Sequence, residues 1–381
     1  MNTHADVVVI GGGVMGTSIA YHLARAGVHD VVLVERDELA SGSTSRAAGG
    51  VRAQFSDELN IRLGARSLEA FARFGEEPGQ DIGLHRVGYL FLLSTPEEVA
   101  AFEAGVRLQN SLGVPSRMLE PAEAQRLSPL ITTDGLLAAA FSPDDGHCTP
   151  ESVVHGYAAG ARRHGATVLR HCEVTGIDTR GDDITAVVTR RGRIGTGTVI
   201  CAAGAWSKAV GAMVGVDLPV RPLRRQIAVT EPVTGLPPGL PMTIDFTSSL
   251  YFHTEGPGLL VGMSDPDETT GFSTETHHRW IPRLCEAMER RAPALLDLRR
   301  TGGWAGLYEI TPDHNALIGE AGSCSRFLYA TGFSGHGFLQ GPAVGEVIRD
   351  LYLDRVPFVD ISPLSVERFA ADAPRPEVNR V

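Results

Sequence analysis

Three glycines near the N-terminus have the spacing of a phosphate-binding turn. Gly11, Gly13 and Gly16 satisfy the pattern GxGxxG between an apolar run at 6–10 and an apolar-periodic segment at 14–26. That order predicts a buried strand, a tight turn and a helix. Gly11 would permit the turn, Gly13 would let a diphosphate approach the backbone, and Gly16 would let helix and strand pack closely. The unpaired N–H groups of the helix start would then face the diphosphate.

An acidic residue follows where such a unit needs one. Residues 31–34 predict a second buried strand, and Glu35 stands at its end. Its carboxylate is expected to accept hydrogen bonds from an adenosine ribose and to repel a 2′-phosphate, which disfavours NADP. A loop rich in Gly, Ser and Thr follows at 41–50, where an NAD enzyme would continue with further strand–helix units. The sequence therefore favours FAD.

Composition sets the size and class of the fold. A chain of 381 residues predicts two or three domains, or one composite of two interleaved domains. Apolar residues make up 43% and charged residues 21%, which is typical of a compact globular protein. The net charge of −11, without a basic run among aromatics, argues against a nucleic-acid partner.

Cysteines and terminal segments indicate the compartment. The five cysteines are odd in number, scattered and without a CxxC pair, so neither a disulfide framework nor a metal site is expected. Residues 1–5 lack the basic and apolar parts of a signal peptide, and no apolar run approaches the roughly 20 residues that cross a bilayer. We expect a cytoplasmic protein without a membrane span.

Capping side chains mark the starts of several helices. Ser56 is expected to cap a helix over 57–74, and Thr95, with the proline after it, to open another. Thr149, also followed by proline, would open a helix that Gly165 ends. Further helices are expected over 277–291 and 341–352, and strands over 87–93, 135–141, 167–174, 184–189, 194–200 and within 225–263.

Six segments resemble, in the same order, the D-amino-acid oxidase superfamily, and within it the branch of sarcosine oxidase and the proline dehydrogenase β subunit. They are residues 11–16, 35–36, 42–52, 202–206, 304–313 and 331–338. The resemblance implies an α/β fold in which a glutathione-reductase-like FAD-binding Rossmann domain is interleaved with an antiparallel-sheet α+β substrate domain. It assigns 1–85, 145–215 and 305–381 to the first domain and 86–144 and 216–304 to the second.

The resemblance also implies the cofactor-binding residues. Ser43 and Thr44 would contact the pyrophosphate or flavin, and the backbone of Val174 the adenine. Gly335 and Gly337 precede a predicted helix, so backbone N–H groups there would stabilise the negative charge of reduced flavin. The expected set comprises Gly11, Gly13, Val14, Met15, Gly16, Glu35, Arg36, Ser43, Thr44, Arg46, Gly49, Gly50, Val174, Ala203, Gly204, Trp206, Gly306, Gly335, His336, Gly337, Phe338 and Leu339.

Two positions predict noncovalent FAD. Relatives that link their flavin covalently carry cysteine at the position of Gly306 or histidine at that of Arg46. Neither linking side chain is present in this sequence. Arg46 would instead contact the flavin or its phosphates, or have only a structural role.

The resemblance assigns four residues to the substrate side. Arg52 matches an arginine that binds the substrate carboxylate, and Tyr308 an active-site tyrosine. Tyr251 would offer an aromatic ring above the flavin, and His336 would polarise flavin or substrate. Plainer interpretations stay open: a structural ion pair for Arg52, a core position for Tyr251, and a turn residue that bonds only backbone for His336.

Two lysines of the family are missing. Leu339 replaces the lysine that shares the substrate carboxylate, and Leu260 the lysine linked to oxygen activation. A positive charge near the flavin helps superoxide form, so its loss favours a dehydrogenase or slow oxidase. The substrate would then be bulkier, less anionic, or held by another arginine such as Arg224 or Arg225.

The leading hypothesis is FAD-dependent oxidation of the C–N bond of a secondary or tertiary amine, an N-methyl or cyclic amino acid, to an imine. The substrate would be a small-molecule amine, and the electron acceptor oxygen or a carrier. Deamination of glycine or a D-amino acid is an alternative, favoured if an arginine rather than Tyr308 faces the carboxylate. A third hypothesis is an FAD-carrying assembly factor or subunit of an electron-transfer complex. Homo- and hetero-oligomers both stay open.

Overall fold

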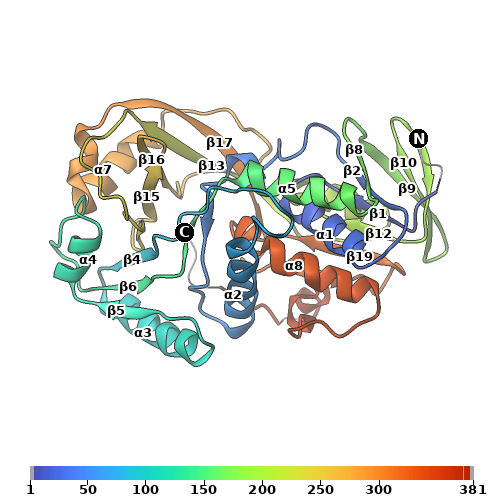
Figure 1. The fold of residues 1–381 in the computed structure, drawn as a ribbon, viewed down its shortest axis with the longest axis horizontal. Coiled ribbons are helices and arrows are strands. Elements are labelled where there is room, and N and C mark those ends of the chain that lie inside the picture. Colours follow the sequence, from blue (N-terminus) through green and yellow to red (C-terminus); the bar gives the residue numbers. More distant parts are fainter. Residues whose placement is uncertain (1–3, 372, 378–381) are drawn as a thin grey trace.

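Two large sheets occupy opposite halves of the molecule in the computed structural model, which describes residues 4–371 and 373–377. A six-stranded sheet lies in the right half of Figure 1 and an eight-stranded sheet in the left half, with α2 (Glu58–Ala72) between them. In the described part of the chain, no helix combines the length and apolar character needed to cross a lipid bilayer.

The six-stranded sheet is mostly parallel. Its strands are β1 (Val7–Ile10), β2 (Val31–Val34), β8 (Thr167–Leu169), β12 (Val199–Cys201), β18 (Leu317–Glu320) and β19 (Phe327–Thr331). Their order is β18-β19-β12-β1-β2-β8, and only β18 runs antiparallel to its neighbour. The strands predicted at 6–10 and 31–34 are confirmed, and every residue of β1 and β2 is buried, as expected of inner parallel strands.

Alternate residues of β1 face two different layers. Val7 and Val9 pack against a helical layer, whereas Val8 and Ile10 pack against a small antiparallel sheet. The helices are α1 (Val14–Arg25), α5 (Pro150–Arg163) and α8 (Gly337–Tyr352), and the small sheet contains β9 (Val174–Arg180), β10 (Asp183–Thr189) and β11 (Gly192–Gly195). This three-layered arrangement confirms the predicted α/β class.

The eight-stranded sheet is antiparallel apart from one pair. In order it contains β17 (Arg300–Ile310), β13 (Arg221–Thr230), β16 (Gly258–Met263), β15 (Leu250–Glu255), β14 (Met242–Asp245), β4 (Tyr89–Leu93), β6 (Ala138–Ser142) and β5 (Arg117–Leu119). Only β14 and β4 are parallel. The antiparallel sheet predicted from the resemblance is therefore present, and β17 continues across residue 305, where the sequence places a domain boundary.

Each face of this sheet packs against helices. On β4, Leu90 and Leu92 share a core with Leu284 of α7 (Ile281–Arg291), on the side that also holds α4 (Pro121–Leu127). Phe91 points the other way, toward Phe102 of α3 (Pro96–Ser111). The remaining elements are α6 (Ser207–Ala212) and a two-stranded sheet of β3 (Gly50–Val51) and β7 (Gly146–His147).

One predicted helix cap is wrong. Asp57, not Ser56, caps α2, because its side chain accepts a hydrogen bond from the Asn60 N–H at 3.0 Å. The Ser56 hydroxyl donates instead to Glu377 at 2.6 Å. The capping position of Thr95 is confirmed, since it forms a capping box with Glu98.

Other helix boundaries shift. Thr149 precedes α5 as predicted but makes no capping hydrogen bond through its side chain. α7 begins at Ile281, four residues later than the predicted 277, with Pro282 in its first turn, where proline is tolerated because no intrahelical N–H is needed. α8 begins at Gly337, before the predicted 341, and contains Pro342 in its interior.

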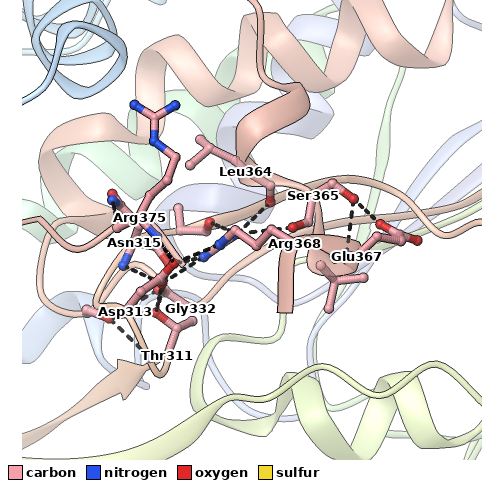
Figure 2. A network of polar contacts seen from close by, with 12 residues as sticks. Thr311, Asp313, Asn315, Gly332, Leu364, Ser365, Glu367, Arg368 and Arg375 are labelled. Atoms are coloured by element: carbon pink, nitrogen blue, oxygen red, sulfur yellow. Dashed lines mark hydrogen bonds and ion pairs between the residues drawn. The ribbon is translucent and has the colours of Figure 1, made fainter. Parts of the chain in front are cut away.

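A buried polar network ties the C-terminal segment to the turn after β17 (Figure 2). Arg368 forms a bidentate ion pair with Asp313, at 2.8 and 2.9 Å. Asp313 also accepts from the backbone N–H of Arg375 at 3.0 Å. Beyond it, Glu377 accepts from Asn60 on α2 at 3.0 Å. Residues far apart in the sequence are thereby fixed around the end of β17.

Candidate cofactor and substrate site

A cavity of 670 Å³ lies between the two sheets. Its walls include the carboxyl ends of β1 and β2, at Ile10 and Val34, and residues Gly306 to Glu309 of β17. Ligands of open α/β sheets bind outside the carboxyl ends of the strands, and the volume is in the usual range for ligand pockets. The cavity is therefore the candidate site.

The glycine-rich turn forms one end of this cavity. Gly11 has a φ of 118°, in the region that favours glycine. A Cβ at Gly16 would lie 1.8 Å from the carbonyl oxygen of Gly11, so this glycine allows the helix to pack on the turn. A Cβ at Gly13 would lie 3.1 Å from the Thr44 hydroxyl, which accepts a hydrogen bond from the Val14 N–H. The absence of a side chain at Gly13 thus leaves its backbone open to a diphosphate, beside the Thr44 hydroxyl.

An acid and a stack of side chains line the same region. The Glu35 carboxylate accepts from the backbone N–H groups of Gly12 and Asp37, at 2.6 and 2.8 Å. The Arg36 guanidinium lies 3.9 Å from the ring of Trp206, and Trp206 stacks on Phe272 at 5.6 Å. A fixed carboxylate beside flat side chains suits an adenosine with its ribose hydroxyls.

The start of α8 forms another part of the cavity wall. Gly335 has a φ of 103°, and a Cβ there would lie 2.6 Å from the Tyr308 ring. Gly337 and Phe338, the first residues of α8, line the cavity. A helix start at this position provides the positive end of a dipole for a group that becomes negative on reduction.

Glu309 lines the cavity although the sequence did not single it out. Its carboxylate accepts from the Thr331 hydroxyl at 2.9 Å and the Gly332 N–H at 3.1 Å. Burial raises its pKa to about 7, against the effect of these hydrogen bonds. It lies within 3.7 Å of Cβ positions built on Gly204 and Gly337. The carboxylate therefore faces the middle of the cavity.

Strand alternation explains why sequence reasoning missed Glu309. Neighbouring residues on a strand point to opposite faces. If Tyr308 is predicted to face the site, the next residue, Glu309, is therefore predicted to face away from it. Both residues nevertheless line the cavity, at the end of β17. The available signal was a carboxylate in the otherwise uncharged stretch from Gly302 to Ile310.

The two predicted tyrosines lie at different depths. Tyr308 lines the cavity, with its ring 5.3 Å from the guanidinium of Arg225. Tyr251 packs on Gly262, where a Cβ would lie 2.2 Å from its phenol oxygen, and it is not among the residues that line the cavity. Burial raises the pKa of both phenols, and the charge of Arg225 opposes this. Both therefore stay neutral near neutral pH.

Arg52 and His336 form a buried pair outside the cavity lining. Arg52 donates to the Gln54 carbonyl, and its guanidinium lies 4.3 Å from the Phe55 ring and 3.2 Å from Nε2 of His336. Burial, followed by the charge of Arg52, lowers the pKa of His336 well below its ordinary value. His336 is therefore neutral, and the predicted substrate roles of both residues stay predictions.

Most of the predicted cofactor residues line the cavity. They are Gly11, Gly13, Val14, Met15, Glu35, Arg36, Ser43, Thr44, Arg46, Val174, Ala203, Gly204, Trp206, Gly306, Gly335, Gly337 and Phe338.

Four other predicted glycine and leucine positions lie behind the wall. Gly16 has the packing role described above, and a Cβ at Gly49 would lie 2.3 Å from the Cys148 carbonyl oxygen. A Cβ at Gly50 would meet the hydroxyl of Tyr89, and Leu339 is buried in the core. These positions support the wall through packing.

Comparisons with known proteins identify relatives of this chain. The chain is 32% identical to the mitochondrial dimethylglycine dehydrogenase of Rattus norvegicus over 385 residues, covering 96% of this chain and 45% of that protein. It is 31% identical to the mitochondrial sarcosine dehydrogenase of Mus musculus, covering 96% and 41%. The chain thus spans less than half the length of these relatives.

A solved structure matches over the full fold. The L-proline dehydrogenase from P. horikoshii superposes with a TM-score of 0.93 at 33% identity, covering 98% of this chain and 100% of that one. Residues 6–351 match the model of a family described as FAD dependent oxidoreductase. The chain belongs to this FAD dependent oxidoreductase family.

Proposed function

We propose that the protein binds FAD noncovalently and oxidises the C–N bond of a secondary or tertiary amine, an N-methyl or cyclic amino acid. The observation that carries this proposal is that one cavity joins a dinucleotide cradle, at Gly13 and Glu35, to a wall that holds Tyr308 and Arg225. FAD held at Gly13 and Glu35 would supply the acceptor for the hydride equivalent on the carbon next to nitrogen, and the resulting C=N bond would be hydrolysed by water.

The named relatives support this substrate class. Two of them are called dimethylglycine and sarcosine dehydrogenase, and the matched structure is an L-proline dehydrogenase. All three substrates are amino acids with a secondary or tertiary amine. This chain matches less than half of those longer dehydrogenases and holds the site described above, so we propose that it carries out the amine oxidation.

Noncovalent binding is supported by the residues around Gly306. A Cβ at Gly306 would lie 2.8 Å from the Cβ of Arg46, so Arg46 fills the space of a side chain there. Arg46 donates to the Ala305 carbonyl at 3.3 Å and accepts from the Trp304 indole at 3.0 Å through its own carbonyl. Neither a thiol nor an imidazole is available at these two positions.

The chain's own residues would orient the substrate and exclude water. In this proposal 1–85, 145–215 and 305–381 hold the cofactor, and 86–144 and 216–304 cover it. Tyr308 contacts the substrate, with Tyr251 and the Arg52–His336 pair behind it. Leu260 and Leu339 are buried and uncharged. The absence of a cation there favours an electron carrier over oxygen as acceptor.

Anaerobic reduction of the bound flavin tests the proposal. Purified yellow protein is mixed with sarcosine, dimethylglycine, proline, glycine and D-alanine, and loss of the flavin absorption band is followed before air is admitted. We expect the N-methyl and cyclic amino acids to reduce the flavin and glycine and D-alanine to do so slowly. Faster reduction by glycine or D-alanine would favour deamination of primary amino acids. Failure of every amine would overturn the proposal.

A further inference from the structure

Three arginines of the described chain line the cavity: Arg36, Arg46 and Arg225. The first stacks on an indole ring and the second donates to a backbone carbonyl. Arg225 differs, because its Nε is buried without a hydrogen-bond partner among the described residues. A buried N–H of a cation is costly unless an acceptor reaches it. Arg225 therefore lines the cavity with a guanidinium whose donors the described residues do not all satisfy.

The neighbouring Arg224 provides an internal comparison. Arg224 forms a bidentate ion pair with Glu268, at 2.9 and 3.0 Å. Arg225 has no ion pair in the part of the chain that the structure describes, and its Nη1 donates only to the Arg224 carbonyl at 3.3 Å. Successive side chains on a strand point to opposite faces. One arginine therefore faces a loop carboxylate, and the other faces the cavity.

Strand pairing places Arg225 beside the predicted substrate wall. On β13 Arg225 pairs with Gly306 of β17, and Leu223 pairs with Tyr308. Gly306 has no side chain to block the guanidinium, which reaches to 5.3 Å from the Tyr308 ring. The same charge acts on Tyr251. Arg225 thus provides a cation beside the neutral phenol of Tyr308 at the cavity wall.

We propose that Arg225 binds the carboxylate of the substrate. This inference rests on the amine oxidation proposed above and adds the side chain that holds the carboxylate of the amino acid. Arg225 acts beside Tyr308 and not in its place. The planar guanidinium presents donors in a fork that matches a carboxylate, and Nε is one of them. A carboxylate held there satisfies the buried N–H and fixes the position of the amine carbon. Arg224, which the sequence left as an alternative, already has its carboxylate.

Ligand binding to the FAD-loaded enzyme tests this proposal without turnover. Acetate and propionate are titrated against the neutral acetamide and propionamide, followed by the flavin absorption spectrum and by calorimetry. Arg225→Gln should weaken carboxylate binding by about 10- to 100-fold, the usual strength of a charge-assisted pair, and leave amide binding unchanged. Arg225→Lys keeps the charge without the fork and should show an intermediate loss. Arg224→Gln is the matched control and should keep carboxylate affinity.

Three results would overturn the proposal: unchanged carboxylate affinity in Arg225→Gln, an equal loss in Arg224→Gln, or a loss confined to Arg52→Ala. If Arg225→Gln fails to retain FAD, the carboxylate affinity of Arg225→Lys tests the proposal instead. An unchanged affinity in Arg225→Lys would mean that the paired donors of the guanidinium do not bind the carboxylate.

The same variants separate this proposal from the proposed function. With sarcosine, Arg225→Gln should raise the half-saturating concentration by about tenfold or more and change the limiting rate of flavin reduction much less. Carboxylate binding that depends on Arg225 in a protein that no amine reduces would refute the amine oxidation alone. Amine reduction with an unchanged half-saturating concentration would refute the role of Arg225 alone.

Discussion

The Arg52 guanidinium lies 3.2 Å from Nε2 of His336, and both side chains are buried. An imidazole so close to a permanent cation stays neutral, because protonation would place two positive charges side by side in a site of low dielectric constant. The neutral Nε2 accepts a hydrogen bond from Arg52. This pair holds the residue that immediately precedes α8, at the edge of the candidate flavin site.

Removing the charge of Arg52 should raise the pKa of His336. Arg52→Met keeps most of the side-chain volume and removes one of the two main causes that lower this pKa. We expect flavin reduction by amines to gain a further dependence on pH in the mildly acidic range, in addition to any that Glu309 causes in the unaltered protein. The pH profile of the limiting reduction rate measures this. Arg52→Lys, which retains a cation, is the control, and identical profiles for all three proteins would contradict the prediction.

Glu309→Gln should change how stability depends on pH. The pKa of Glu309 is raised to about 7, so its contribution to stability is fully present below its ordinary pKa and is lost as the pH rises through about 7. Between about pH 4.5 and about pH 8, the variant should therefore gain about 3 kcal/mol in unfolding free energy relative to the unaltered protein. Urea unfolding of FAD-free protein measures this. A constant difference between the two proteins would rule out a raised pKa.

Gly13→Ala and Gly16→Ala should separate cofactor binding from folding. A Cβ at Gly13 meets only the Thr44 hydroxyl, at 3.1 Å, in the space where the diphosphate would approach. We expect FAD affinity to fall by about tenfold or more, with a loss of apoprotein stability below about 1 kcal/mol. A Cβ at Gly16 lies 1.8 Å from a backbone oxygen, so that variant should be destabilised even without FAD. Flavin titration and thermal unfolding check both, and equal effects of the two changes would contradict this distinction.

Breaking the Asp313–Arg368 ion pair should be costly. Both side chains are buried, so Asp313→Asn or Arg368→Met leaves the partner's charge uncompensated and should lower the unfolding free energy by about 3–5 kcal/mol. The double variant should lose less than the sum of the two single changes, because no buried charge is left alone. Denaturant unfolding of the four proteins measures the coupling. Additive losses would mean that the pair does not act as a unit.

Local sequence signals predicted the parts of the fold that depend on neighbouring residues. β1, β2 and the glycine turn follow from an apolar run and glycine spacing, and the helix start at Thr95 follows from a capping residue with a proline after it. Ser56 and Asp57 are both good caps, and the choice between them depends on Glu377, which is distant in sequence. Such long-range contacts could not be predicted from a local pattern.

In the site, too, some residues could be predicted from local sequence and others only from long-range packing. The residues that line the cofactor end of the cavity carry recognisable motifs. Glu309 becomes a candidate, and Arg225 is distinguished from Arg224, only once β17 and β13 are paired. Arg52 matches the family's carboxylate-binding arginine in sequence. In the structure, however, it contacts Gln54 and His336 and does not line the cavity. Residue type can be read from sequence, but the direction of a side chain depends on its packing.

The C-terminal ties of Arg368, Arg375 and Glu377 have a consequence for biosynthesis. They hold the turn after Tyr308 and the start of α2, and α8 itself closes the flavin end of the cavity. A nascent polypeptide that still has residues 337–377 inside the ribosome has its N-terminal glycine turn but lacks the part of the pocket wall that α8 supplies. We therefore expect stable capture of the flavin nucleotide only after that stretch has emerged and folded.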